Sequence, residues 1–156
     1  MRWIALLFWL ALCFAVAGVS GRWTAGEVEG WYKTLRMPWI APPNWLFGPV
    51  WTLLYALMAV AAWRVGMAAS SPLCNWALAL FLVQLALNFA WSLIFFRQHS
   101  IGGALVEIAV LWVFIGASTL AFAQIDMAAA WMMAPYWAWV SFASLLNFQI
   151  WQLNRP

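Results

Sequence analysis

The fifteen tryptophans among 156 residues constrain this chain more than any other feature of its sequence. An indole ring has a large apolar body and one N–H donor. Tryptophan therefore suits the boundary between hydrocarbon and headgroups, or the wall of a cavity for an apolar ligand. The core of a soluble domain has little use for so many indoles. The sequence predicts a membrane protein that can also hold a flat aromatic ligand.

The overall composition supports a membrane environment. Hydrophobic residues make up 68% of the chain and charged residues only 7%, and the mean hydropathy is +0.89. Water cannot be the main solvent of such a chain. The net charge of +3 comes from single basic residues that form no stripe along which phosphates could bind. We therefore expect membrane lipid as a partner and no nucleic acid.

Five apolar runs are long enough to cross a bilayer, which takes about 20 residues of helix. They cover approximately residues 3–20, 45–65, 73–96, 101–123 and 128–153. The links after the second, third and fourth runs are short, so consecutive helices must be antiparallel neighbours. The sequence predicts an all-α integral membrane protein, in which residues 1–156 form one domain built as a bundle of five transmembrane helices.

The first run has two interpretations. Arg2, the apolar stretch and Ala15-Val16-Ala17 imitate a secretory signal peptide with its cleavage site. Trp3 and Trp9 suit an interface anchor and a bundle wall instead. We therefore expect this segment to be retained as the first helix.

Lys and Arg are divided unequally between the two sides that five crossings create. One side has Arg2 and Arg64. The other has the larger set, Arg22, Lys33, Arg36, Arg97 and Arg155. Cytoplasmic loops are enriched in these residues, so the first loop and the C-terminus are predicted to be cytoplasmic.

The first loop, residues 21–44, is the one segment where polar residues concentrate. Thr24 and Glu27 fit a capping box, which predicts a short helix that begins there. This helix carries Trp31 and should end before Pro38. The segment is predicted either to act as a lid over the bundle or to lie among the headgroups as an interfacial helix.

Residues of the usual catalytic and metal sites are nearly missing. His99 is the single histidine, and Cys13 and Cys74 lack the spacing of metal ligands. The sequence contains no Ser/His/Asp grouping and no glycine-rich phosphate loop. It therefore argues against a hydrolase or a metalloenzyme, and we predict no metal site and no obligatory cofactor.

Polar side chains inside the spans are the main candidates for a site, because they are costly in hydrocarbon. Three helices carry stripes at helical spacing: Trp51 and Tyr55 on the second, Gln84, Asn88 and Trp91 on the third, and Trp139, Ala143, Leu146 and Asn147 on the fifth. Such stripes would line a cavity that stacks on a planar ring while amides orient it. The alternative is plain helix packing with amide hydrogen bonds between helices.

Two further residue patterns in the spans leave alternatives open. Glu107 is the one acid well inside a span, which snorkelling, protonation, ligand binding or a proton relay would each explain. Ala86 and Ala90 have the small-xxx-small spacing of close helix contacts, either with a neighbouring helix or in a homodimer.

Several ordered motifs resemble those of the TspO/translocator protein family, once called peripheral benzodiazepine receptors. They are Trp31-Tyr32, Met37-Pro38-Trp39, Pro42-Pro43, Pro49 to Tyr55, Gln84 to Trp91, Phe95-Phe96, Pro135 to Trp139 and Leu146 to Phe148. The motifs run through nearly the whole chain from Gly30 onward, so the resemblance is specific.

The resemblance implies a five-helix bundle, often dimeric. Its cavity beneath the first loop would bind porphyrins such as protoporphyrin IX, and isoquinoline or benzodiazepine-type ligands. By motif position the cavity residues would be Trp51, Asn88, Trp91, Trp139, Ala143 and Leu146, with Trp31 and Trp39 in the lid. The implied function is a tetrapyrrole receptor, sensor or regulator of porphyrin levels and stress response. The alternatives are a porphyrin transporter, or a light-dependent porphyrin-degrading catalyst with Trp51 and Trp139 as electron donors.

Animal members of this family carry a cholesterol-recognition pattern with a central tyrosine and a following basic residue. Here Phe148 takes the central place, and Gln152 stands where an early basic residue would be. Because the pattern is broken and is weak evidence even when intact, sterol transport is not expected. The short termini and this broken pattern predict a multi-pass protein of a bacterial cell membrane, although some family members are placed in an outer membrane.

Overall fold

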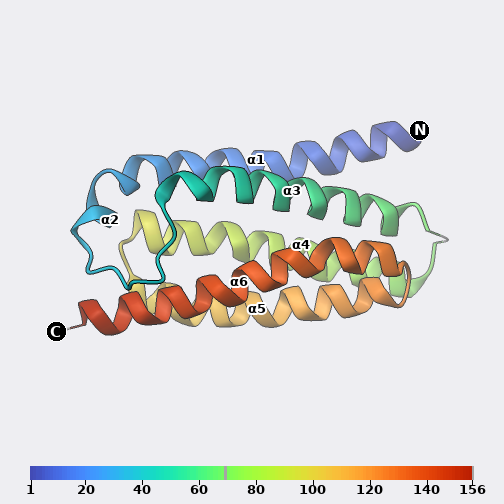
Figure 1. The fold of residues 1–156 in the computed structure, drawn as a ribbon. Helices are drawn as coiled ribbons and strands as arrows, with labels where there is room; N and C mark the ends of the chain where they lie inside the picture. The colour runs from blue at the N-terminus through green and yellow to red at the C-terminus, as the bar shows by residue number, and fades with distance from the viewer. Residues whose placement is uncertain (69, 156) are drawn as a thin grey trace.

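The chain folds as a set of long helices that run side by side (Figure 1). The computed structural model describes residues 1–68 and 70–155. Over these residues the α-helices are α1 (Arg2–Val28), α2 (Trp31–Thr34), α3 (Asn44–Gly66), α4 (Pro72–Ser92), α5 (Ile101–Ala123) and α6 (Met127–Asn154), and there is no strand. A π-helix, η1 (Leu93–Arg97), continues α4. The short helix α2 and the C-terminus lie at one end of the bundle, and the N-terminus lies at the other.

Side-chain caps explain where three of the helices begin. The hydroxyl of Ser71 accepts from the Cys74 N–H, with Pro72 in the first helical turn. The hydroxyl of Ser100 accepts from an N–H at the start of α5, and the carboxylate of Asp126 does the same for α6. Each cap satisfies a backbone donor that has no partner within its helix.

The helix count and the length of the first helix differ from the predictions. Over the described residues there are six α-helices, against a predicted bundle of five, because the short α2 is separate from the five long ones. The predicted loop helix that carries Trp31 and ends before Pro38 is present as α2. The predicted helix start at Thr24 is wrong, since α1 continues to Val28. The Thr24 hydroxyl donates to the Ser20 carbonyl, four residues back inside α1, instead of capping a new helix. The connection to α3 is therefore residues 29–43 rather than 21–44, and it includes α2.

Four helical stretches of the described chain are long and apolar enough to cross a membrane. They are Arg2–Val28, Asn44–Gly66, Pro72–Arg97 and Ile101–Ala123, with mean hydropathies between 1.6 and 2.3. The helix α6 has 28 residues but is not one of the four, because its aromatic and amide side chains lower its mean hydropathy. The fifth crossing stays a prediction, and α6, at about 42 Å, is long enough for it.

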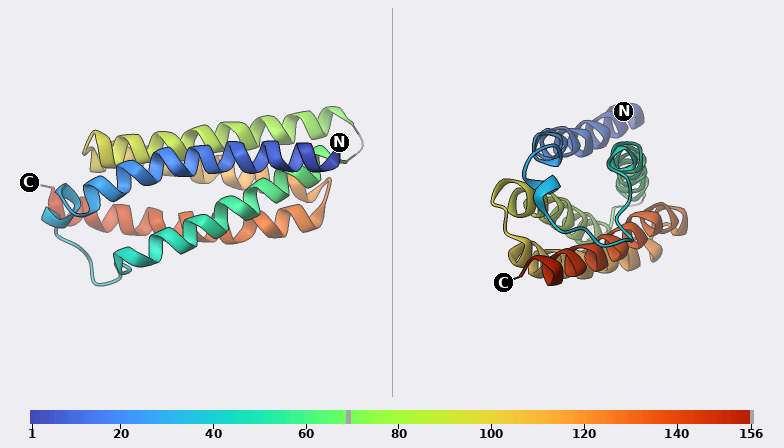
Figure 2. Two further views of the ribbon diagram at one scale, coloured as in Figure 1. Left: turned by 90° about the horizontal axis from the view of Figure 1, so that it is seen from above. Right: turned by 60° about the vertical axis from the view of Figure 1, so that its left-hand side comes forward.

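The helices pack as antiparallel neighbours, α1 on α3, α4 on α5 and α5 on α6, while α3 also contacts α6. Figure 2 shows α1 and α3 close together at the N-terminal end of the bundle and farther apart at the α2 end. A large hydrophobic core occupies the middle and the N-terminal end, around Met58, Phe81, Ile115 and Met133. A smaller cluster at the other end packs beneath α2 and includes Tyr32, Phe95, Phe96, Leu146 and Ile150.

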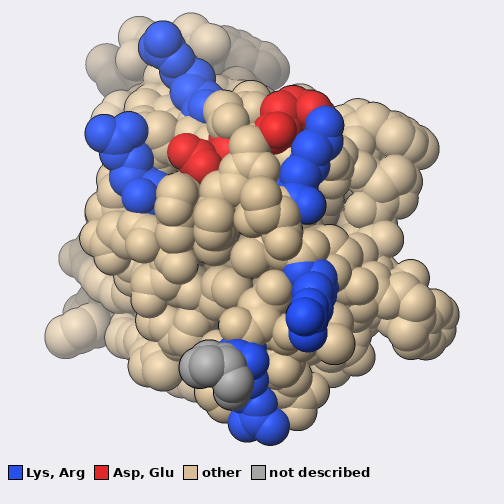
Figure 3. Space-filling model, turned by 90° about the vertical axis from the view of Figure 1, so that its left-hand side faces the viewer, with Lys and Arg blue, Asp and Glu red and all other residues tan. Residues whose placement is uncertain are grey.

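Basic side chains gather at the α2 end of the molecule (Figure 3). This end has Arg22, Lys33, Arg36, Arg97 and Arg155, whereas Arg2 and Arg64 lie toward the opposite end. Glu29 on this face forms an ion pair with Lys33. The two ends of the bundle therefore differ in charge as the sequence predicts, while the orientation in a membrane stays a prediction.

Candidate functional site

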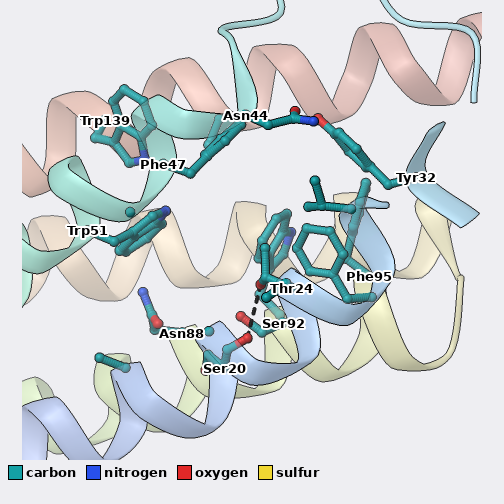
Figure 4. A pocket seen from close by; sticks show the side chains of 18 of the residues that line it. Ser20, Thr24, Tyr32, Asn44, Phe47, Trp51, Asn88, Ser92, Phe95 and Trp139 are labelled. Carbon is teal, nitrogen blue, oxygen red and sulfur yellow. Dashed lines mark hydrogen bonds between the residues drawn. The ribbon is translucent and has the colours of Figure 1, made fainter. Parts of the chain in front are cut away.

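A cavity of about 560 Å³ lies inside the bundle at the α2 end (Figure 4). All six α-helices and η1 contribute to its wall. Its volume falls within the range of roughly 300–1,000 Å³ in which proteins bind small molecules. The lining is mostly apolar, with a few hydroxyl and amide groups among aromatic rings. Such a lining suits a flat apolar ligand with a few polar atoms.

Aromatic rings from three helices form the main surfaces of the cavity. Trp51 of α3 lies 5.6 Å from Tyr55 between ring centroids. Trp139 of α6 lies 6.2 Å from Phe47, in an edge-on arrangement. Trp91 of α4 stacks on Phe95, with 5.1 Å between centroids and 19° between planes. Rings placed around the cavity can stack on a planar ligand from more than one side.

Two of these indoles keep a free donor. The N–H groups of Trp51 and Trp139 have no hydrogen-bond partner within the described chain. Trp91 differs, because its N–H donates to the Asn147 Oδ1 at 3.1 Å, and the Asn147 amide in turn donates to the Ile101 carbonyl. Trp91 is therefore fixed in place, whereas Trp51 and Trp139 can donate to a ligand.

A buried polar network closes the cavity toward the middle of the bundle. The Tyr55 hydroxyl donates to Asn88 Oδ1 at 2.6 Å, and Asn88 Nδ2 donates to the Tyr136 hydroxyl at 2.9 Å. Tyr136 then donates to Gln84 Oε1 at 2.9 Å. The network joins α3, α4 and α6, so it holds the cavity floor in one arrangement.

Most of the residues predicted for the site are brought together around this cavity. Those that line it are Trp51, Tyr55, Asn88, Trp91, Trp139, Ala143, Leu146 and Asn147. Gln84 is fully buried one turn deeper, in contact with Tyr136 and the Met58 sulfur. Trp39 does not line the cavity and is 93% exposed, in the segment between α2 and α3.

Trp31 positions α2 instead of lining the cavity. Its ring stacks on His99 with 4.2 Å between centroids and packs edge-on against Phe95. His99 Nε2 lies 3.0 Å from a carboxylate oxygen of Glu27, which ties the end of α1 to the loop before α5. These contacts place the next residue, Tyr32, at the edge of the cavity.

Tyr32 is a lining residue that the sequence reasoning missed. Its ring packs against Phe95 and Phe96, and its burial raises the pKa of the phenol to about 12. In Figure 4 the side chains of Tyr32 and Asn44 point toward one another across the end of the cavity. The sequence contains one signal for this position. Tyr32 directly follows Trp31, which is predicted to lie in the lid, and an aromatic ring next to a lid residue can face the cavity.

The α1 wall was also missed. Ala17, Ser20, Gly21 and Thr24 line the cavity at the three- and four-residue spacing of one helix face. These residues are small, and small residues in a span also mark ordinary helix contacts. Their spacing was the only signal, and it does not separate the two interpretations.

Glu107 lies outside the set that lines the cavity. Both of its carboxylate oxygens are buried without a hydrogen-bond partner in the described chain. No group of three or more His, Cys, Asp or Glu side chains that could hold a metal ion occurs among the described residues. The cavity therefore offers stacking surfaces and mostly neutral hydrogen-bonding groups, and the charged lining residue, Glu29, lies at its edge in an ion pair with Lys33.

The fold and the cavity together define an integral, multi-pass, all-helical membrane protein with an internal aromatic pocket near one end. Within that class the chain belongs to the TspO/MBR family, which matches residues 9–152. It is 41% identical to the tryptophan-rich protein TspO of Chlorobaculum tepidum over 97% of this chain and 96% of that protein.

Two other relatives extend the comparison. The chain is 39% identical to the tryptophan-rich sensory protein of Cereibacter sphaeroides, over all of this chain and 96% of that protein. It is 36% identical to the human translocator protein, over 88% of this chain and 82% of that protein. The family resemblance read from the motifs is thereby confirmed.

Proposed function

We propose that this protein binds a porphyrin-type tetrapyrrole in the cavity and acts as a membrane receptor or sensor that regulates porphyrin levels or a stress response. One observation carries the proposal. Trp51 and Trp139 line a cavity of about 560 Å³ from different helices, each with an N–H that has no partner in the described chain. The name of the relative from Cereibacter sphaeroides, a sensory protein, agrees with a sensing role.

The energetics of stacking favour a planar ligand. Each aromatic contact contributes about 1 kcal/mol beyond the burial of area. Burial of a large apolar ring adds about 25 cal/mol per Å². These terms are enough for a Kd in the micromolar range, which corresponds to about −8 kcal/mol. Isoquinoline or benzodiazepine-type molecules are flat and aromatic, and we expect them to compete for the same surfaces.

The test is a titration of the purified protein with protoporphyrin IX in detergent and in the dark, following the porphyrin absorption band. We expect saturable binding that weakens by about two- to tenfold in Trp51→Phe and in Trp139→Phe, because each change removes one indole contact. Trp131→Phe is the matched control on α6, since Trp131 is 71% exposed and does not line the cavity.

Two results would contradict the proposal. One is the absence of saturable binding by the unmodified protein. The other is equal weakening in Trp131→Phe and Trp139→Phe, which would place the ligand on the outer surface of the bundle. Either outcome means that the cavity is not a porphyrin site.

A transport function is ranked second because of the packing beyond the cavity floor. The core between the floor and the far end includes Met58, Phe81, Ile115 and Met133, all fully buried. Passage across the membrane would need this part of the bundle to separate. Binding needs no such change.

Light-dependent breakdown of the bound porphyrin is an alternative that the positions of Trp51 and Trp139 favour, because indoles beside an excited ring can donate electrons. In this case illumination should cause a ligand-dependent loss of porphyrin absorbance. Measured at saturating porphyrin, the loss should disappear in Trp51→Phe or Trp139→Phe although both variants still bind the ligand. A turnover that falls only in proportion to affinity would make the indoles binding surfaces only.

We further propose that the α2 end is cytoplasmic and that two copies associate in the membrane. The unequal distribution of Lys and Arg supports the first point. Ala86 of α4 supports the second, because it is exposed and has the small-residue spacing with Ala90 that allows close helix contact. The segment 29–43 would then act as the lid that reports ligand binding to a cytoplasmic partner.

A further inference from the structure

The cavity wall is not equally closed on all sides. Several lining residues are also exposed on the outside of the molecule, and every one of them lies in α1, directly after it, or in the first half of α3. They are Gly21, Ala25, Glu29, Asn44, Trp45, Gly48 and Thr52. The cavity therefore has an opening along the line where α1 and α3 face each other.

The rest of the wall is closed. The lining residues from α4, η1, α5 and α6 are buried or partly buried, and none is exposed. On that side large rings such as Phe95 and Trp91 pack tightly together. At the α2 end, Tyr32 is 6% exposed and faces Asn44 across the cavity (Figure 4). The opening between α1 and α3 thus extends from Gly21 and Thr52 to Glu29 and Asn44, which lie beside the end covered by α2.

Packing between α1 and α3 explains why the gap occurs at this height. Toward the N-terminal end of the bundle, the Trp63 N–H donates to the Arg2 carbonyl at 3.0 Å, and Trp3 stacks on Trp63. At the cavity both helices leave open space where they line it, since a Cβ added at Gly21 or Gly48 would meet nothing within 4 Å. Figure 2 shows the same divergence of the two helices.

The opening lies near the α2 end of the predicted spans, where Gly21 precedes Arg22 and where Gly48 and Thr52 fall within the first turns of α3. Gly21 is about 10 Å from the end of α1 and Thr52 about 12 Å from the start of α3, at 1.5 Å per residue. Both helices are among the stretches apolar enough to span the bilayer. Away from Glu29 and Asn44, the edge of the gap carries the small or weakly polar, uncharged residues Gly21, Ala25, Gly48 and Thr52. An apolar molecule dissolved in lipid can approach this part of the edge from the boundary between hydrocarbon and headgroups.

We infer that the gap between α1 and α3, edged by Gly21, Ala25, Gly48 and Thr52, is a lateral portal through which ligand enters the cavity from the bilayer. The inference rests on the proposed binding function and adds the route and the ligand class. The portal admits a flat apolar molecule edge-on, already concentrated in lipid. A charged, water-soluble molecule would instead enter at the α2 end, past the exposed Glu29 and Asn44.

The test blocks the portal without touching the cavity floor. Gly48→Cys is alkylated with N-benzylmaleimide in detergent and returned to lipid nanodiscs. Protoporphyrin IX is then delivered from preloaded lipid vesicles, and association is followed by tryptophan quenching. We expect alkylation to slow association at least about tenfold. Dissociation should slow in parallel, so that Kd stays within about threefold of the unalkylated variant.

Gly18→Cys, alkylated in the same way, is the matched control. Gly18 lies on α1 with open space at its Cβ and is exposed, but it does not line the cavity. Its association rate should not change. Gly21→Cys is a second portal variant in case Gly48→Cys does not fold. The native Cys13 and Cys74 are buried and are present in every sample.

Three results would overturn the portal. Association could be unchanged after alkylation at position 48 and at position 21, or slowed equally at position 18. Affinity could also fall with no change of association rate, which would mean that the added group fills the cavity. In each case the unalkylated variants still bind porphyrin. Failure of the proposed function is different, because then the unmodified protein does not bind at all.

Discussion

Tyr136 shows how single side chains hold the cavity floor together. Its hydroxyl accepts from Asn88 and donates to Gln84, and the residue is completely buried. Removal of this oxygen leaves an amide N–H and an amide oxygen without partners in an apolar interior. A buried polar group left unpaired costs more than an average hydrogen bond contributes.

Tyr136→Phe should therefore lower the free energy of unfolding by about 1–2 kcal/mol. Unfolding in a mixed detergent series, followed by circular dichroism, measures the change. Tyr32→Phe is the control, because the Tyr32 hydroxyl has no hydrogen-bond partner in the described chain. Equal stability of the two variants would show that the network contributes nothing to the fold.

Asp126 combines a helix cap with an ion pair, and the two roles can be separated. Its carboxylate accepts from the Ala128 N–H at the start of α6 and from Arg64 Nε at 2.6 Å. The hydrogen bond from Arg64 lowers the pKa of Asp126. A carboxylate with a lowered pKa stabilises the fold above its unfolded pKa, and this contribution is lost as the pH falls through the folded pKa.

We expect Asp126→Asn to keep the cap but lose the ion pair, with a small decrease in Tm at pH 7 that disappears below about pH 4. Asp126→Ala should lose the cap as well, which lowers the free energy of unfolding by about 1 kcal/mol more at every pH. Thermal unfolding between pH 3 and pH 7 measures both differences. If the difference in Tm between the unmodified protein and Asp126→Asn does not change with pH, the ion pair is not its cause.

The residue scale also shows what the sequence can predict about the cavity. Amides inside apolar spans are costly enough to mark a site, and Asn88 lines the cavity together with Trp51 and Trp139 from the neighbouring predicted stripes. Gln84 has the same spacing but lies one turn deeper, and spacing contains no information on depth. Ser20 and Thr24 were missed because small residues fit a cavity wall and a helix contact equally well.

At the scale of the elements, the lengths of the apolar runs predict the long helices well. The capping pattern predicts the bounds of the first loop less well. The pair Thr24 and Glu27 has the pattern of a helix start, yet α1 runs through it. No proline interrupts the chain before Pro38, and a helix already formed continues as long as each residue adds a hydrogen bond. The helix ends at Val28, shortly before Gly30, and the contact of Glu27 with His99 ties this end of α1 to the loop before α5.

The contact between α5 and α6 depends on a glycine. A Cβ at Gly116 would lie 2.6 Å from Cζ2 of Trp137, a rigid ring that packs against Trp112 at 5.2 Å between centroids. Gly116→Ala should therefore force the helices apart and cost about 1–3 kcal/mol. The loss of unfolding free energy in detergent measures this cost.

Gly18→Ala is the matched control for that change. A Cβ at Gly18 would meet nothing within 4 Å. The same substitution in the interior of α1 should stabilise the helix by up to about 1 kcal/mol, because alanine has the higher helix propensity. If the free energy of unfolding changes in the same direction in both variants, helix propensity rather than packing determines the effect at Gly116.

At the scale of the whole molecule, the cavity and the basic residues occupy the same end. The opposite half of the bundle is a solid core. The position of the cavity follows partly from side-chain size along α1. Near the N-terminus Trp3 of α1 stacks on Trp63 of α3, whereas nearer α2 the face of α1 that lines the cavity carries alanine, serine, glycine and threonine. The sequence contains this gradient, but only the relative placement of the helices makes it a cavity.

The orientation of the bundle is the prediction that belongs to this scale. The α2 end has Arg22, Lys33, Arg36, Arg97 and Arg155, against Arg2 and Arg64 at the other end. Because positively charged loops stay in the cytoplasm during insertion, green fluorescent protein fused after Arg155 should fluoresce in a bacterial host. Alkaline phosphatase fused at the same place should be inactive. The opposite pair of results would place the α2 end, and with it the proposed lid, outside the cytoplasm. Any reporting of ligand binding would then face that side of the membrane.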